Sequence, residues 1–252
     1  MTTENPDNQE KVMSFWEHIE ELRRRLMVAL IALAVTTMAS FVFADKIINI
    51  LTIPIGGPGK LQAIEVTENV NVFLKVSLLS GFLLALPVVL YELFAFIIPG
   101  LKPGERRWLI LGVLFATFMF ALGVAFAYLV MLPNALPFLL NFLNIPTTPR
   151  PSSYFDFVTG LLFWIGASFQ TPLLFFILAR FGVVNASALL KYWRVAIVVI
   201  AIIAAVITPT TDPVNMSLLM APLIALYFLS VLLAFLAQRR NNNAPDTDDK
   251  AD

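Results

Sequence analysis

Six long runs of apolar residues divide this sequence, and they constrain its fold more than any other feature. A helix rises about 1.5 Å per residue, so about 20 residues are needed to cross a hydrocarbon core about 30 Å thick. The first four runs meet this requirement, whereas the fifth has thirteen residues and the sixth follows it after a tight turn. We therefore expect six transmembrane helices, the last two of them shortened. The runs cover residues 26–43, 76–98, 108–132, 157–178, 195–207 and 216–236.

The composition fits a chain whose solvent is largely lipid. Of the 252 residues, 59% are hydrophobic and only 13% are charged, and the mean hydropathy is +0.82. These values differ clearly from those of a soluble domain. A membrane β-barrel would show segments of about ten residues with alternating polarity, and the apolar runs do not alternate. The predicted fold class is an all-α integral membrane protein.

Basic residues are distributed unevenly between the two sides of the predicted spans. Thirteen lie on the side of the N-terminus and four on the other side. Because basic residues are enriched in cytoplasmic loops, both termini are predicted to face the cytoplasm. The first side carries Lys11, Arg23, Arg24, Arg25, Lys102, Arg106, Arg107, Arg180, Lys191, Arg194, Arg239, Arg240 and Lys250, and the second carries Lys46, Lys60, Lys75 and Arg150.

The sequence outside the spans predicts a simple domain organisation. Residues 1–25 form a cytoplasmic N-terminal arm with an interfacial helix, residues 26–236 the six-span transmembrane domain, and residues 237–252 a disordered cytoplasmic tail. The arm shows no short apolar core followed by small residues, so no cleavable signal is expected. The absence of cysteine excludes disulfide bonds and thiol chemistry.

The stretch EHIEELRRRL at 17–26 places acids beside the arginines that the orientation explains. Glu21 precedes Arg25 by four residues, a spacing at which an exposed helical ion pair contributes about 0.2–0.5 kcal/mol. Such local pairing is one explanation. The combination recurs after the second run, where Glu105 precedes two arginines in PGLKPGERR. Since a carboxylate accepts two parallel hydrogen bonds from a guanidinium group, the other explanation is that these acids are placed to pair with a guanidinium partner.

Five stretches resemble motifs of the TatC family, the polytopic subunits of the twin-arginine (Sec-independent) protein translocase. The resemblance covers about residues 14–238. It implies six spans with both termini cytoplasmic, in agreement with the charge distribution, and a location in a prokaryotic cytoplasmic (inner) membrane. The stretches are HIEELRRRL at 18–26, FAFIIPGLKPGERR at 94–107, GVAFAYLVMLP at 123–133, SFQTP at 168–172 and ITPTTDP at 207–213.

The resemblance also implies a function in protein transport and no enzymatic activity. The chain would be the signal-peptide receptor and core subunit of a translocase that exports folded proteins with twin-arginine signals, driven by the proton-motive force. The implied partners are those signal peptides, the single-span subunits TatA and TatB, the lipid bilayer and further copies of the chain in the receptor complex. Neither a cofactor nor nucleic acid is implied.

Four residues of the resemblance concern the signal peptide most directly. The family's N-terminal glutamate falls on Glu21 and its loop glutamate on Glu105, which implies that both are counter-charges for the signal's two arginines. Arg23 and Arg25 match basic positions of the same motif, where orientation and local pairing are a sufficient alternative.

Five further matches have simple structural alternatives. Phe96 and Pro99 fit a family F-x-x-P pattern, and a span that ends at a proline explains them equally. Pro54 matches a proline of the first outer loop, and Asp212 lies in a turn. Gln170 is a polar residue within the fourth span and is expected to contact either a partner helix or the bundle itself. Many relatives carry glutamate there, and Gln170 cannot carry a charge.

Other functions require residues that the sequence lacks or places elsewhere. An intramembrane serine protease would need a G-x-S-x-G nucleophile motif, and a zinc protease two histidines around a glutamate, whereas the only histidine is His18. A secondary transporter of a small solute is the remaining alternative. Glu92, Gln170 and the prolines Pro87 and Pro172 would outline its polar path through broken helices.

Overall fold

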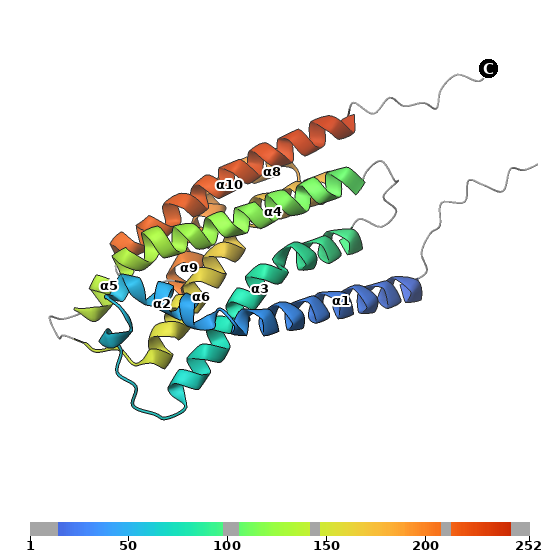
Figure 1. Ribbon diagram of the computed structural model, residues 1–252. Helices are drawn as coiled ribbons and strands as arrows, with labels where there is room; N and C mark the ends of the chain where they lie inside the picture. The colour runs from blue at the N-terminus through green and yellow to red at the C-terminus, as the bar shows by residue number, and fades with distance from the viewer. Residues whose placement is uncertain (1–14, 98–105, 142–146, 208–212, 243–252) are drawn as a thin grey trace, which may run out of the picture.

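The computed structural model of the chain describes residues 15–97, 106–141, 147–207 and 213–242, and these residues form helices and connecting loops without a strand (Figure 1). The long helices run roughly lengthwise through one bundle, and α1 begins at the end where α10 finishes (Figure 1). The elements are α1 (Phe15–Phe41), α2 (Ala44–Thr52), the 3-10 turns η1 (Ile53–Ile55) and η2 (Pro58–Lys60), α3 (Glu68–Ile97), α4 (Arg106–Phe126), the π-helical turn η3 (Ala127–Met131), α5 (Leu132–Leu140), α6 (Pro151–Ser168), α7 (Thr171–Arg180), α8 (Ala186–Lys191), α9 (Trp193–Ile207) and α10 (Pro213–Asn242).

Five described helical segments are long and apolar enough to cross a membrane, which confirms the predicted class of multi-pass membrane protein. The fifth apolar run forms α9, which has only 15 residues, as expected. The expectation that the sixth run is also shortened was wrong, because α10 has 30 residues and its apolar part has 23. The long segments are Trp16–Phe41, Glu68–Ile97, Leu109–Leu140, Pro151–Arg180 and Met216–Gln238.

Two spans depart from their predicted limits at prolines. The third continues eight residues beyond the predicted end, because the π-helical turn η3 leads without a break into α5, and such a local adjustment lets a helix continue through a proline such as Pro133. The fourth divides into α6 and α7. Pro172 cannot donate to the carbonyl of Ser168, and the Thr171 hydroxyl donates to that oxygen instead at 2.6 Å. A break within this apolar segment is therefore tolerated.

The close contact between α1 and α3 sets the register of these two helices. The Thr36 hydroxyl donates to the Gly81 carbonyl at 2.8 Å. A Cβ atom on Gly81 would lie 2.5 Å from Cα of Thr37, so only glycine permits this approach of the two backbones. Small residues at a helix crossing allow the close packing that drives helix association in lipid. The two helices cross here and remain side by side toward the end that carries the start of α1 (Figure 1).

The opposite end of the bundle is closed by a cap made of α2, η1, η2 and the loop before α3, which the sequence did not predict. The Tyr128 and Tyr154 hydroxyls each donate at 2.7 Å to carbonyls of α2, those of Ile50 and Leu51. The Ile50 carbonyl also accepts the backbone N–H of Ile53, the C-cap of α2, so the Tyr128 hydroxyl is its second donor. The two tyrosine hydrogen bonds tie α2 to η3 and α6.

An ion-pair cluster joins this cap to the start of α6. Arg150 Nη2 donates to Glu65 Oε1 at 2.8 Å, and Arg150 Nε donates to Glu68 Oε1 at 2.7 Å. Glu68 is 2% exposed, and Arg150 is its charge partner. The hydrogen bonds to Glu65 and Glu68 raise the pKa of Arg150 further above its ordinary value, so the guanidinium keeps its charge.

Candidate functional site

One arginine joins two glutamates between the facing ends of α1 and α3. Arg25 donates to Glu21 Oε1 through Nη2 at 2.6 Å and Nε at 2.9 Å, and to Glu92 Oε2 through Nη1 at 3.0 Å. Arg25 lies twelve residues before Thr37, and Glu92 lies eleven residues after Gly81. In antiparallel helices these intervals correspond to about 18 Å and about 17 Å of rise. The glycine contact therefore brings the two charges to the same level.

The three charged side chains are largely shielded from solvent. Their exposed fractions are 14% for Glu21, 18% for Arg25 and 16% for Glu92. Two carboxylates face one guanidinium, so this group holds one more acid than base. Charge-assisted hydrogen bonds of this kind are stronger than neutral ones, and they are less screened here than at a fully exposed position.

One carboxylate oxygen in this group accepts no hydrogen bond from the described residues. Glu21 Oε2 is covered and accepts no hydrogen bond from the residues that the structure describes. His18 Nδ1 lies 3.9 Å from this oxygen, beyond hydrogen-bond distance. A covered carboxylate oxygen without a donor is energetically unfavourable, so this position suits an additional donor.

An aromatic pair borders the charged group. The His18 ring stacks on the Phe96 ring with a centroid distance of 4.4 Å and an interplanar angle of 11°. Since His18 belongs to α1 and Phe96 to α3, the pair closes the same interhelical space one turn nearer the start of α1. We call His18, Glu21, Arg25, Glu92 and Phe96 the α1–α3 cluster.

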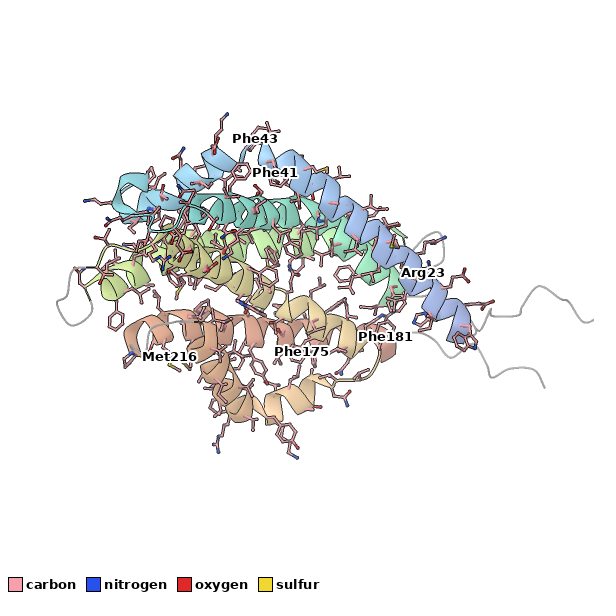
Figure 2. The ribbon with its side chains drawn as sticks, turned by 90° about the horizontal axis from the view of Figure 1, so that it is seen from below. Arg23, Phe41, Phe43, Phe175, Phe181 and Met216 are labelled. Atoms are coloured by element: carbon pink, nitrogen blue, oxygen red, sulfur yellow. The ribbon has the colours of Figure 1, made fainter. Side chains whose placement is uncertain are left out.

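The structure brings together three of the residues predicted from the sequence and separates others from them. Glu21, Arg25 and Phe96 belong to the α1–α3 cluster. Arg23 is exposed on α1 (Figure 2), away from the interface with α3. Pro54 lies in the first turn of η1 in the cap, at the far end of the bundle. Glu105, Pro99 and Asp212 lie outside the described residues.

Two members of the cluster were not predicted as part of this site. Glu92 was considered only as part of a transporter path, and His18 only as the single histidine and the first residue of the HIEELRRRL motif. A usable signal existed for Glu92, because an acid near the end of an apolar span requires a partner. The identity of that partner depends on the register of α1 against α3, which the sequence does not show.

Gln170 occupies a separate position, at the break between α6 and α7. Its Nε2 donates to the Ala116 carbonyl of α4 at 2.8 Å, which is a hydrogen bond within the bundle. Its Oε1 is buried and accepts no hydrogen bond from the described residues. Residues on both sides of it, Ser168 and Thr171, line an apolar hollow of about 630 Å³ between α7, α8, α9 and α10.

Comparisons with known sequences agree on one family. A family profile described as Sec-independent protein translocase protein (TatC) matches residues 17–222. The Sec-independent protein translocase protein TatC of Deinococcus radiodurans is 40% identical over 228 residues, which cover 87% of this chain and 84% of that protein. The chloroplastic Sec-independent protein translocase protein TATC of Pisum sativum is 37% identical over 237 residues, which cover 93% of this chain and 67% of that protein.

A solved structure shares the fold. The crystal structure of a twin arginine translocase receptor, TatC, matches with a TM-score of 0.74 and 34% identity, over 88% of this chain and 100% of that one. The resemblance seen in the sequence motifs is thereby confirmed, and the alternative of a small-solute transporter is wrong. The chain belongs to the TatC family and is a core subunit of the Sec-independent protein translocase.

Proposed function

We propose that this chain is the signal-peptide receptor of its translocase and that the α1–α3 cluster binds an arginine of the twin-arginine signal. The observation that carries the proposal is the covered Glu21 carboxylate, whose Oε2 has no donor among the described residues. A guanidinium group can supply that donor together with a compensating charge. The neighbouring Phe96 and His18 rings offer flat faces on which guanidinium groups stack favourably.

Glu105 is the second counter-charge in this proposal. It lies in the segment between α3 and α4, one residue before α4 begins at Arg106. The sequence motif supports it, since this acid precedes two arginines as in the family pattern. Its contribution is tested separately from that of Glu21.

Binding of a labelled twin-arginine peptide to the purified protein in detergent tests the receptor function. Glu21→Gln and Glu105→Gln should each weaken binding by about 1–3 kcal/mol, the range of hydrogen bonds to charged groups. Glu20→Gln is the matched control, because Glu20 is an exposed acid of the same helix. Wild-type affinity in both Glu21→Gln and Glu105→Gln would refute the assignment.

The orientation follows from the same proposal. We place the end of the bundle that carries the α1–α3 cluster in the cytoplasm of a prokaryotic cell, at the inner membrane, with both termini on that side. The distribution of basic residues supports this orientation. Because the sequence has no cysteine, single cysteines at positions 20 and 60 can be labelled with an impermeant maleimide. In inverted vesicles, position 20 should react and position 60 should not.

The partners in this proposal are single-span TatA and TatB subunits and further copies of the chain, and the proton-motive force drives transport. The apolar hollow beside Gln170 supports a lateral contact with a partner helix, because the exposed side of α9 adjoins it. Cysteine crosslinking from position 170 to a partner span tests this contact. Crosslinks that form only within the bundle would contradict it.

A further inference from the structure

We propose that Arg25 is a built-in occupant of the arginine site, displaced when a signal peptide binds, and that Glu92 is a second carboxylate of that site. The inference rests on the proposed receptor function and adds to it a competing group and a binding residue. It concerns ligand exchange between two guanidinium groups, one belonging to the chain and one to the peptide.

The contacts of Arg25 are those expected of a bound arginine ligand. Its guanidinium uses three nitrogen atoms, two toward Glu21 and one toward Glu92. The two acids come from different helices, so together they form a pocket for a planar, fork-shaped cation. Arg25 therefore occupies the position that an incoming arginine would need in order to reach both carboxylates.

The pocket retains unused binding capacity while Arg25 fills it. Glu21 Oε2 is covered and has no donor among the described residues, although Glu21 Oε1 accepts two hydrogen bonds from Arg25. Once the side chains that cover Oε2 move aside, a peptide arginine can bind there before Arg25 leaves. Displacement thus passes through an arrangement in which the acids are never without a cation, which avoids the high cost of an unpaired shielded carboxylate.

Exchange of one guanidinium for another conserves the charge and the hydrogen-bond geometry of the site. A peptide lysine cannot do the same, because an ammonium group is a point charge that does not form the paired, planar hydrogen bonds of arginine. Competition with Arg25 would therefore reject lysine more strongly than an open acidic site would. Arg25 contributes specificity because a ligand binds only if its contacts with the two carboxylates can replace those of Arg25.

The alternative is that Arg25 only clamps α1 to α3. The two roles predict opposite effects of removing the guanidinium. If Arg25 competes with the ligand, its removal tightens peptide binding, whereas loss of a clamp loosens the site and weakens binding. The two possible roles of Glu92, a support for Arg25 or a contact of the peptide, also predict different effects of its removal on peptide binding. If it only holds Arg25, its removal has no effect once Arg25 is gone, but if it contacts the peptide, its removal weakens binding in both backgrounds.

The experiment measures binding of a twin-arginine peptide and its twin-lysine counterpart to the purified full-length protein in nanodiscs, by fluorescence anisotropy. Arg25→Gln should raise the affinity for the arginine peptide about tenfold and narrow its advantage over the lysine peptide. Glu92→Gln should lower the affinity about tenfold, both alone and combined with Arg25→Gln. Glu20→Gln should bind as the wild type does, and thermal unfolding monitors the fold of each variant.

Unchanged or weaker binding by a folded Arg25→Gln variant would overturn the displacement of Arg25. Should that variant not fold, Arg25→Lys makes the same comparison, because it keeps the charge and loses the paired hydrogen bonds. Equal affinities of Arg25→Gln with and without Glu92→Gln would overturn the role of Glu92. Either result can occur while Glu21→Gln abolishes binding, in which case the receptor function stands. Wild-type affinity of both Glu21→Gln and Glu105→Gln would instead refute the receptor function itself.

Discussion

Arg25 Nη1 lies 3.0 Å from Glu92 Oε2, so a charged hydrogen bond joins α1 to α3 near the start of α1 and the end of α3. Both side chains are more than four-fifths covered, which distinguishes this pair from an ordinary surface ion pair. The same guanidinium binds Glu21 one turn earlier on α1. The stability of the α1–α3 interface and the chemistry of the proposed site therefore depend on one group.

A double-mutant cycle should detect this dependence in the free energy of unfolding. Arg25→Gln and Glu92→Gln are each expected to destabilise the protein, with a coupling energy of about 0.5–3 kcal/mol between them. The measurement is chemical unfolding in detergent for the wild type, both single variants and the double variant. Strictly additive effects would show that the two groups do not interact in solution.

Gly81→Ala should destabilise the crossing of α1 and α3. The added methyl group would lie within 2.5 Å of Cα of Thr37, so the helices must separate, at a cost of about 1–3 kcal/mol. The separation also weakens the contact of Arg25 with Glu92 and should change peptide affinity. Gly112→Ala is the matched control, since an added Cβ there meets nothing within 4 Å. Equal stabilities of the two variants would contradict the close packing.

Arg150→Gln should loosen the cap at the opposite end of the bundle. It leaves Glu68, which is 2% exposed, without its charge partner. The expected results are a lower midpoint of thermal unfolding and faster proteolysis of the loop before α3. Lys60→Gln is the control, because Lys60 is an exposed cation of the same cap.

The ion pairs of Arg150 should stabilise the protein equally at neutral and mildly alkaline pH. The pKa of Arg150 is raised, so its stabilising contribution is fully present below the ordinary arginine pKa and is lost only as the pH rises above the raised value. The effect of Arg150→Gln should thus be equal at neutral and mildly alkaline pH.

Gln170→Leu should cost about 0.6–2 kcal/mol, because the Ala116 carbonyl loses its side-chain donor in an apolar environment. If Gln170 also contacts a partner helix, the variant should assemble less well with TatA and TatB. Copurification of the partners and export of a reporter protein measure this second effect. Normal assembly and export would confine Gln170 to a structural role within the bundle.

Lengthening α9 should impair export without affecting signal-peptide binding. Its 15 residues span about 22 Å, less than the hydrocarbon core of about 30 Å, so we expect the bilayer to be thinner beside it. Insertion of four leucines after Val199 restores a span of normal length. Export and peptide affinity should be measured on the same preparation. Unchanged export would mean that neighbouring helices shield the short span and that local thinning has no part in transport.

The helical membrane fold was predictable because it depends on local properties of the sequence. In a bilayer each span must satisfy its own backbone hydrogen bonds, so an uninterrupted apolar run is sufficient to predict a helix. The short α9 was predictable for the same reason. The extension of the third span past Pro133 was not, because a proline that a helix passes with a π-helical turn and a proline that ends a helix look alike in sequence.

The acids of the opening motif were recognisable from the sequence, but their partners were not. The spacing of Glu21 and Arg25 within one helix already predicted their ion pair. The addition of Glu92 depends on how far α1 slides along α3, and that register is fixed by the contact of Thr36 and Thr37 with Gly81. Such a contact forms only when the backbones of two helices approach each other closely, and a pattern within one segment of the sequence does not show which helices do so. Sequence therefore determined which charges the protein carries at this end of the bundle, and tertiary packing determined which of them share a guanidinium.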